Sequence, residues 1–138
     1  MGYESPITNI DLYQYGTDLI AANDDQTQTN SGSYVLGKQM VLNVKIYAYS
    51  NFLFNVDIKP TGGSAQAKLL LNGVELDSWS TGIAGFTTFS YDLVGEYWNV
   101  GDILEVYMKA TPGGQLCDIK NMRLYGLRSP FYNSKKQV

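Results

Sequence analysis

The chain has 138 residues, 44% hydrophobic and only 17% charged, with a formal net charge of −3 and no histidine. Because its only basic pair is Lys135-Lys136, it lacks the basic stripe of a nucleic-acid-binding protein, and we expect no nucleic-acid partner. No apolar run approaches the roughly 20 residues that cross a bilayer, so we expect no membrane insertion.

Hydrophobic and polar residues alternate with period two along most of the first half of the chain. The first predicted strand spans residues 7–15, and the polar stretch within residues 17–32 predicts a loop. A half-buried strand is predicted over 39–49. Another follows after Asn51, in which Phe54, Val56 and Ile58 share the buried face, and it is expected to stop at Pro60.

The second half of the chain contains the clearest local signal, Asn72-Gly73 between two alternating segments. Asn-Gly accepts the positive φ angles of a type I′ turn, so residues 67–79 are predicted to form a β-hairpin. Further strands are predicted over 86–93, 103–111 and 118–126. The alternation breaks phase between Ile119 and Met122, which predicts a β-bulge in the last strand.

About eight strands without a helix long enough for a crossover predict antiparallel pairing. The expected fold is therefore all-β, an antiparallel β-sandwich of jelly-roll type. We find no linker and expect a single domain over residues 1–138, with an N-terminal arm at 1–6 and a C-terminal tail at 127–138.

The residues that carry most enzyme chemistry are scarce. Without histidine the chain lacks the commonest general base and transition-metal ligand, and the lone Cys117 cannot build a zinc site. No cofactor is expected. A pair of carboxylates could still hydrolyse glycosides, and the candidates are Glu75, Asp77, Asp92, Glu96, Asp102 and Glu105.

A run of polar residues suggests one metal site. Asn23, Asp24 and Asp25 could supply the hard oxygen ligands that Ca²⁺ prefers, and such an ion would pin the predicted loop as structural calcium. The spacing does not match an EF-hand, and a solvated loop tip explains the same residues. Both interpretations stay open.

Three aromatic residues at strand ends or in loops are candidates for glycan binding, because sugar rings stack on flat exposed aromatic side chains. They are Trp79, Tyr97 and Trp98. A tryptophan at the end of a sandwich can equally cap the core, and we favour that role for Trp98.

Tyrosine dominates the aromatic content, with eleven residues against five phenylalanines and two tryptophans. A tyrosine ring covers apolar surface while its hydroxyl stays polar, which suits half-exposed sheet faces and interfaces. Tyrosine also favours strands in general. The candidate assembly residues are Tyr13, Tyr15, Tyr47, Tyr107, Phe131 and Tyr132.

The segment from Phe89 to Gly126 resembles the closing strands of small jelly rolls. It contains Trp98-Asn99-Val100-Gly101-Asp102, a strand from Ile103 to Lys109, a turn, and a strand from Ile119 to Gly126. This pattern resembles viral capsid and spike domains and jelly-roll carbohydrate-binding modules. The resemblance supports the fold more than either function. The scarcity of catalytic residues is what leads us to expect a binding or assembly domain rather than an enzyme.

Three functions follow as hypotheses. The first is a non-enzymatic virion subunit (capsid, decoration or spike) that forms a homo-oligomer, or binds other structural subunits, through sheet faces and terminal arms. The second is a carbohydrate-binding module with glycans as ligands. The third is a glycosidase or other enzyme, which only the carboxylates support. The first predicts location in a virion; the alternative is a soluble protein, intracellular or exported by a route that this chain does not encode.

Overall fold

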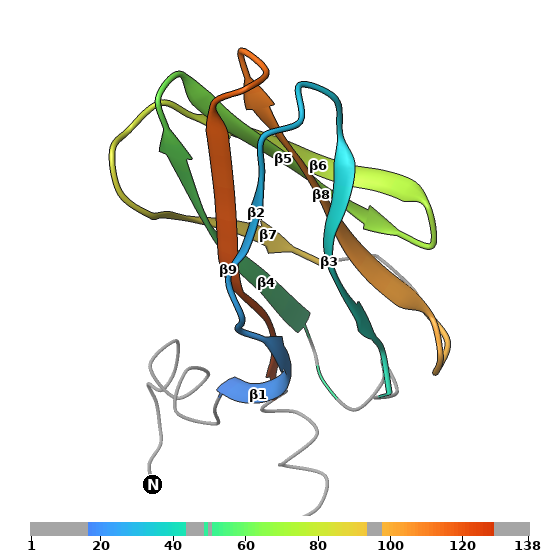
Figure 1. Cartoon of the computed structure of the whole chain (residues 1–138). Helices are drawn as coiled ribbons and strands as arrows, with labels where there is room; N and C mark the ends of the chain where they lie inside the picture. Colours follow the sequence, from blue (N-terminus) through green and yellow to red (C-terminus); the bar gives the residue numbers. More distant parts are fainter. Residues whose placement is uncertain (1–16, 44–48, 50, 94–97, 129–138) are drawn as a thin grey trace, which may run out of the picture.

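The computed structural model describes residues 17–43, 49, 51–93 and 98–128. Within these residues the chain forms strands and no helix, so no helix there could cross a membrane. The strands are β1 (Thr17–Asn23), β2 (Thr27–Thr29), β3 (Val35–Val41), β4 (Asn51–Thr61), β5 (Ser64–Leu71), β6 (Val74–Thr81), β7 (Thr87–Asp92), β8 (Ile103–Thr111) and β9 (Leu116–Leu127) (Figure 1).

Two antiparallel sheets pack face to face. Sheet A has the strand order β1-β9-β4-β7, and the short β2 also pairs with β9. Sheet B has the order β3-β8-β5-β6. Because β1 contacts β3 and β7 contacts β6, the edges of the two sheets lie over each other (Figure 1). The expected all-β sandwich of jelly-roll type is confirmed.

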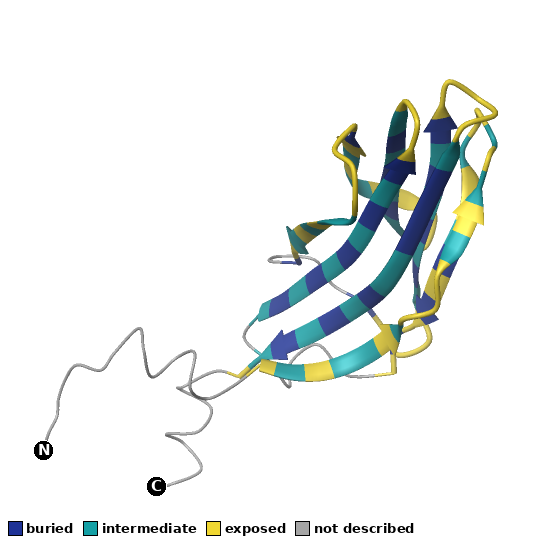
Figure 2. Ribbon diagram, turned by 60° about the vertical axis from the view of Figure 1, so that its left-hand side comes forward, coloured by how far each residue is buried: buried dark blue, intermediate teal, exposed yellow. Residues whose placement is uncertain are grey.

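Burial alternates along the central strands, as Figure 2 shows by its stripes of dark blue and teal. On β4, Phe54, Val56 and Ile58 have no exposed surface, and the residues between them face outward. Burying an aliphatic or phenyl side chain of this size contributes about 1.5 to 3 kcal/mol each. The core between the sheets therefore holds the sandwich together.

The Asn72-Gly73 hairpin is confirmed. Asn72 and Gly73 have φ angles of 51° and 84°, as a type I′ turn requires. Asn72 also ties the turn to β8: its backbone N–H donates to the carbonyl of Ile103 at 2.9 Å, and its Oδ1 accepts from the Ile103 N–H at 2.9 Å. The turn therefore joins β5 to β6 and is also hydrogen-bonded to β8.

The predicted bulge in the last strand is also confirmed. Asn121 has a φ of 53°, and the pairing of β9 with β4 shifts between Asn55 and Asp57. The extra residue returns Met122 to the core side, where it has no exposed surface.

The predicted loop over residues 17–32 is wrong, because β1 and β2 form there as an edge of sheet A. Strand β4 occupies one edge of β9 and β1 occupies the other edge only from Met122 to Leu127, so the rest of that edge pairs with β2, with Thr27 and Thr29 opposite Ile119 and Cys117. A strand at the edge of a sheet needs apolar side chains on one face only. The polar residues of this segment therefore gave no alternating pattern from which the edge strands could be predicted.

Three other predicted strands have different bounds or lie wholly or partly outside the described residues. The strand predicted over 39–49 begins at Val35 and ends at Val41, and residues 44–48 lie outside the described residues. The strand predicted over 7–15 also lies outside them. Strand β4 continues past Pro60 to Thr61, where it pairs only with β9 because β7 ends its pairing at Ile58.

Candidate functional site

The outer face of sheet A carries rows of polar side chains that run across three strands. Asn55 of β4 lies directly opposite Ser90 of β7 and Arg123 of β9. Directly opposed residues share one face of a sheet. The Ser90 hydroxyl donates to Asn55 Oδ1 at 2.6 Å, so the amide of Asn55 is held in one orientation.

The next row centres on Asp57 of β4. Its Oδ1 accepts from the Thr88 hydroxyl at 2.6 Å, and its Oδ2 accepts from Asn121 Nδ2 at 2.9 Å. The bulge in β9 is what brings the Asn121 amide within reach. Both carboxylate oxygens have a fixed donor. We call the residues of these two rows the polar platform: Asn55, Asp57, Thr88, Ser90, Asn121 and Arg123.

Arg123 is fixed by an acidic residue of the β1–β2 connection. Its Nε and Nη2 donate to Asp24 Oδ1 and Oδ2 at 2.9 and 3.1 Å. This bidentate bond lowers the pKa of Asp24 and raises the pKa of Arg123. The side chain of Tyr125 is a further hydrogen-bond partner of Arg123 and also raises its pKa, so two side chains hold the guanidinium on the platform.

One end of the platform contains a buried carboxylate. Asp118 of β9 lies opposite Lys59 of β4 and is only 2% exposed. Its Oδ2 accepts from Gln26 Nε2 at 3.0 Å and lies 3.7 Å from the Lys59 Nζ. Among the described residues, its buried Oδ1 has no hydrogen-bond partner. Buried acceptors are nearly always satisfied, so this oxygen is unusual.

Beside Asp118, a phenyl ring holds two lysines. The Nζ atoms of Lys59 and Lys120 lie 5.1 and 4.1 Å from the centroid of the Phe86 ring. These distances are within the range of cation–π attraction. Phe86 therefore orders two ammonium groups from neighbouring strands on one face.

The other end of the platform is apolar. Tyr125 of β9 lies opposite Leu53 of β4 and Leu19 of β1, and it is half-buried. Leu19 is 54% exposed. An aromatic ring flanked by aliphatic side chains offers a stacking surface next to the hydrogen-bonding rows.

The outer face of sheet B differs in its polar contacts. Among the described residues there, one side-chain hydrogen bond joins two strands, from the Thr111 hydroxyl to Gln66 Oε1 at 3.0 Å. Tyr34 lies under two lysines, with Lys68 and Lys109 Nζ at 4.4 and 4.7 Å from its ring centroid. The linked polar rows are thus a feature of sheet A.

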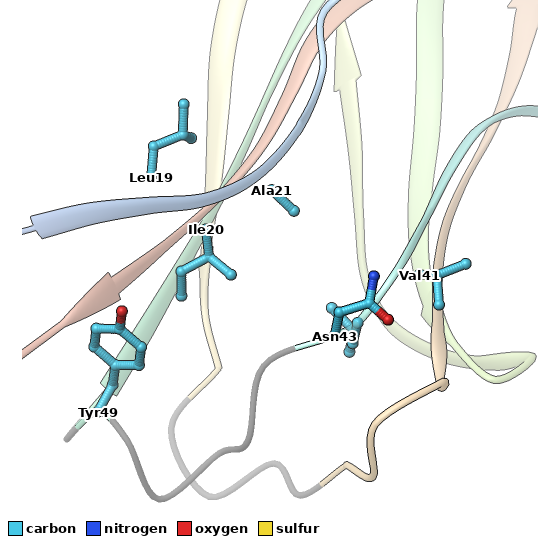
Figure 3. Close-up of a pocket in the computed structure, with 7 residues that line it drawn as sticks. Leu19, Ile20, Ala21, Val41, Asn43 and Tyr49 are labelled. Atoms are coloured by element: carbon cyan, nitrogen blue, oxygen red, sulfur yellow. The ribbon is translucent and has the colours of Figure 1, made fainter.

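A cavity of about 310 Å³ opens at the β1/β3 edge (Figure 3). Tyr49 and Asn43 supply its polar atoms, and the Tyr49 hydroxyl donates to Asp18 Oδ2 at 3.1 Å. The remaining lining is apolar. Seven residues line it: Leu19, Ile20, Ala21, Val41, Leu42, Asn43 and Tyr49.

This edge also concentrates exposed apolar side chains. Leu19 on β1 and Val41 on β3 are 54% and 46% exposed, and Val35 and Leu36 on β3 are exposed as well. Both β1 and β3 are edge strands, so each has one backbone edge without a strand partner among the described residues. Such an edge favours association with another chain.

The structure places the predicted glycan-binding tryptophans in or against the core. Trp98 is 6% exposed and packs edge-on against Phe52 with ring centroids 4.5 Å apart. Trp79 faces inward and stacks on Phe54 and Phe89. The burial of Trp98 fits the core-capping role, and Trp79 is partly buried against the core, so glycan binding by these two residues stays a prediction. Tyr97 lies outside the described residues.

The predicted calcium ligands meet cationic side chains instead. Asn23 Oδ1 accepts from the Lys38 Nζ at 2.7 Å, and Asp24 binds Arg123. Lys38 is 4% exposed, and burial lowers its pKa. In the described part of the chain, no three acidic, cysteine or histidine side chains gather as metal ligands do. The calcium site stays a prediction.

Of the predicted assembly residues, only Tyr107 is described. It lies half-buried on the outer face of β8 in sheet B. The others lie outside the described residues: Tyr13, Tyr15, Tyr47, Phe131 and Tyr132.

Three of the six candidate catalytic carboxylates have structural partners. Glu75 lies 3.7 Å from the Lys68 Nζ. Asp77 Oδ1 accepts from the Ser78 N–H at 2.8 Å, and Asp102 Oδ2 accepts from the Asn99 N–H at 2.8 Å. Asp92 and Glu105 lie on different sheets. Glu96 is outside the described residues.

The polar platform was not predicted as a site. Its signal was present on β4, where Asn55, Asp57 and Lys59 alternate with core residues. Their partners on β7 and β9 are distant in sequence, and the pairing of the strands was needed to bring them together.

The chain matches no protein-family model and no curated protein in sequence. Among solved structures it is similar to the C-terminal domain of EclA, a sugar-binding protein, with 15% identity and a TM-score of 0.55. That likeness covers 77% of this chain and 81% of the EclA domain.

A second similar structure is the insecticidal delta-endotoxin Cry8Ea1 of Bacillus thuringiensis, with 12% identity and a TM-score of 0.51 over 73% of this chain. This chain spans 19% of that toxin's length. The CBM22-1 and GH10 modules of a Clostridium thermocellum xylanase, solved with xylohexaose, match at 11% identity and a TM-score of 0.49. That likeness covers 81% of this chain and 26% of the xylanase chain. The likenesses to EclA and the toxin establish a shared β-sandwich fold.

Proposed function

We propose that this chain is a non-catalytic glycan-binding module that holds a polyhydroxylated chain on the polar platform of sheet A. The observation that carries the proposal is the pair of hydrogen-bonded rows built on Asn55 and Asp57. Side chain–side chain bonds are a minor share of protein hydrogen bonds. Their concentration on one exposed face favours a binding role over simple solvation.

The chemistry of the platform suits sugar hydroxyls. Each hydroxyl both donates and accepts, and neighbouring hydroxyls are matched by groups with two polar atoms at fixed spacing, such as carboxylates, amides and guanidinium groups. Asp57, Asn55 and Arg123 are of these types. Because their neighbours already hold them, little side-chain entropy is lost when a ligand binds.

The shape of the platform suits a chain more than a single sugar. Successive rows on one face of a sheet are two residues apart, which is roughly 6.6 Å. From Tyr125 to Asp118 the rows therefore span roughly 20 Å. The Tyr125 end adds an aromatic surface for the apolar face of a sugar ring. The structurally similar EclA domain belongs to a sugar-binding protein, which supports a sugar as the ligand of the platform.

The test is a glycan array probed with the full chain, followed by calorimetry on the best oligosaccharide. Asn55→Ala and Asp57→Ala should each weaken binding by about tenfold or more, because each removes a fixed hydrogen-bonding group. Gln66→Ala is the matched control, since it removes a comparable side-chain bond on the outer face of sheet B. No bound glycan, or equal losses in all three variants, would contradict the proposal.

Assembly is a second candidate function, and the β1/β3 edge favours it. Exposed Leu19 and Val41 lie beside the cavity, which is large enough to accept an apolar side chain from a second copy. In this candidate function the chain is a self-associating subunit of a particle such as a virion, with its terminal arms contacting neighbours.

Light scattering over a concentration series tests assembly separately from glycan binding. Leu19→Lys and Val41→Lys should lower the molar mass of any multimer, because a charge would be buried in the interface. Val74→Lys is the control, since Val74 is 65% exposed in the β5–β6 hairpin. A monomer at every concentration would contradict the assembly candidate and leave the glycan proposal standing.

A further inference from the structure

The Asp118 end of the platform has features that the neutral hydroxyls of a sugar chain do not require. Lys59 and Lys120 come from adjacent strands, and Phe86 holds both ammonium groups near one ring. The protein as a whole is acidic, with a net charge of −3. Two ordered ammonium groups therefore lie side by side on the proposed binding face, opposite the carboxylates of Asp57 and Asp118 on the paired strands.

Much of the hydrogen-bonding capacity of these lysines is unused. An ammonium group has three N–H donors. Lys59 lies 3.7 Å from Asp118 Oδ2, which is a long ion pair. Among the described residues, Lys120 has no carboxylate partner within ion-pair distance. The nearby carboxylate of Asp57 already accepts from Thr88 and Asn121. An anion placed beside Phe86 would meet free donors from both lysines.

The unpartnered Oδ1 of Asp118 is a second and independent observation. Asp118 is 2% exposed, and within the described part of the chain this oxygen accepts no hydrogen bond. Its surroundings include Gln26 and Lys59, two long side chains that can turn aside to admit a donor. A ligand that carries a hydroxyl next to an anionic group would satisfy both the free acceptor and the free ammonium donors.

We propose that the Asp118 end of the platform is a subsite for a negatively charged sugar, whose carboxylate or sulfate Lys59 and Lys120 bind and whose hydroxyl donates to Asp118. This inference rests on the proposed glycan-binding function and names its ligand class. The Tyr34 cluster on sheet B also has two lysines over one ring, but among the described residues it has no buried carboxylate oxygen without a hydrogen-bond partner beside them.

Calorimetry on the full chain tests the subsite with three hexasaccharides: an oligogalacturonate, a sulfated heparin fragment and neutral xylohexaose. The acidic ligand should bind about tenfold more tightly than xylohexaose at low salt, and this preference should shrink as salt screens the charges. Carboxylate and sulfate are distinguished by which acidic oligomer binds more tightly. Equal affinity for acidic and neutral oligomers would overturn the subsite while the glycan-binding proposal stands. Binding of none of the three, with an empty glycan array, would overturn both.

The double variant Lys59→Gln/Lys120→Gln should lose about tenfold in affinity for the acidic oligomer. The matched control is Lys68→Gln/Lys109→Gln, which removes the same charge beside Tyr34 on sheet B and should lose less than about twofold. Equal losses in the two double variants would mean a general charge effect and would overturn the subsite.

Asp118→Asn tests the hydroxyl contact, with circular dichroism to confirm that the variant folds. If charge alone decided binding, removing this carboxylate would tighten binding of the anion. Because we expect a hydroxyl to donate to Oδ1, affinity should fall by about threefold or more. Tighter binding by a folded variant would overturn the role of Asp118, whereas the lysine variants test the anion contact independently.

Discussion

The indole of Trp79 on β6 lies parallel to the ring of Phe54 on β4, with centroids 6.3 Å apart and 4° between the ring planes. Phe89 of β7 also stacks on Trp79, at 5.8 Å and 25°. One aromatic cluster thus joins sheet B to two strands of sheet A. Stacked aromatic pairs contribute about 0.5 to 1.5 kcal/mol beyond burial. Trp79 therefore connects the two sheets at the β6/β7 edge.

Replacing Trp79 should affect folding rather than glycan binding. Trp79→Ala should lower the free energy of unfolding by about 3 to 5 kcal/mol, because it leaves a cavity between Phe54 and Phe89. Trp79→Phe keeps an aromatic ring and should lose less. Urea denaturation measures both. A variant of unchanged stability that has lost glycan binding would show that the indole is a sugar platform instead.

Gly37 on β3 marks a place where the two sheets approach closely. A Cβ added there would lie 2.5 Å from Met108 Sδ and 2.8 Å from Ile119 Cδ1. Gly37→Ala should therefore lower the free energy of unfolding by about 1 to 3 kcal/mol through overpacking. Gly82→Ala is the control, because its nearest neighbour would be 3.8 Å away. Equal stability of the two variants in thermal unfolding would contradict this packing.

Cys117 should make the fold sensitive to alkaline pH. Burial is the main cause that raises the pKa of its thiol from 9.0 to about 11. Above pH 9 the unfolded chain loses this proton while the folded chain keeps it. The protonated thiol therefore contributes its full share to the free energy of unfolding below pH 9. That free energy should fall by about 2 to 3 kcal/mol as the pH rises from 9 through 11.

Chemical denaturation of the wild type and Cys117→Ala between pH 8 and 11 measures this effect. The pKa values of Tyr34 and Tyr49 are also raised, chiefly by burial, and both tyrosines are present in both proteins. The contribution of Tyr49 cancels in the difference, whereas that of Tyr34 changes slightly, because Cys117 is a minor cause of its raised pKa. The stability gap between wild type and variant should narrow as the pH rises. A gap that stays constant would mean that the thiol is not shielded in the fold.

The hairpin at Asn72-Gly73 and the bulge at Asn121 were predictable because each depends on local chemistry. An Asn-Gly pair tolerates positive φ at both positions, and a phase break in hydrophobic spacing needs an extra residue in the strand. Strand β8 was predicted with its observed bounds, 103–111, for the same reason: its alternation is complete and turns flank it.

The platform and the edge strands were not predictable in this way. The outward position of Asp57 follows from alternation along β4, but its partners Thr88 and Asn121 lie 31 and 64 residues away. Which strands are neighbours is decided by packing of the whole sandwich, not by local pattern. Likewise, β2 exists because β9 offers it a backbone edge, and three polar residues carry no periodic signal of their own.

Calcium binding at Asn23, Asp24 and Asp25 should depend on whether Arg123 leaves the carboxylate of Asp24 free. Calcium would have to compete with Arg123, whose bidentate bond occupies both carboxylate oxygens of Asp24. Arg123→Gln removes that competitor and leaves Asp24 free to bind a cation. We therefore expect calcium to raise the Tm of Arg123→Gln by more than it raises the Tm of the wild type.

Thermal unfolding in calcium and in EDTA measures this difference, and magnesium serves as the ionic-strength control because its small ion demands stricter octahedral geometry. Asp25→Asn in the Arg123→Gln background should remove the calcium response if this loop holds the ion. A Tm that calcium leaves unchanged in both proteins would mean that the acidic residues of the loop serve only to hold Arg123 and Lys38 in place.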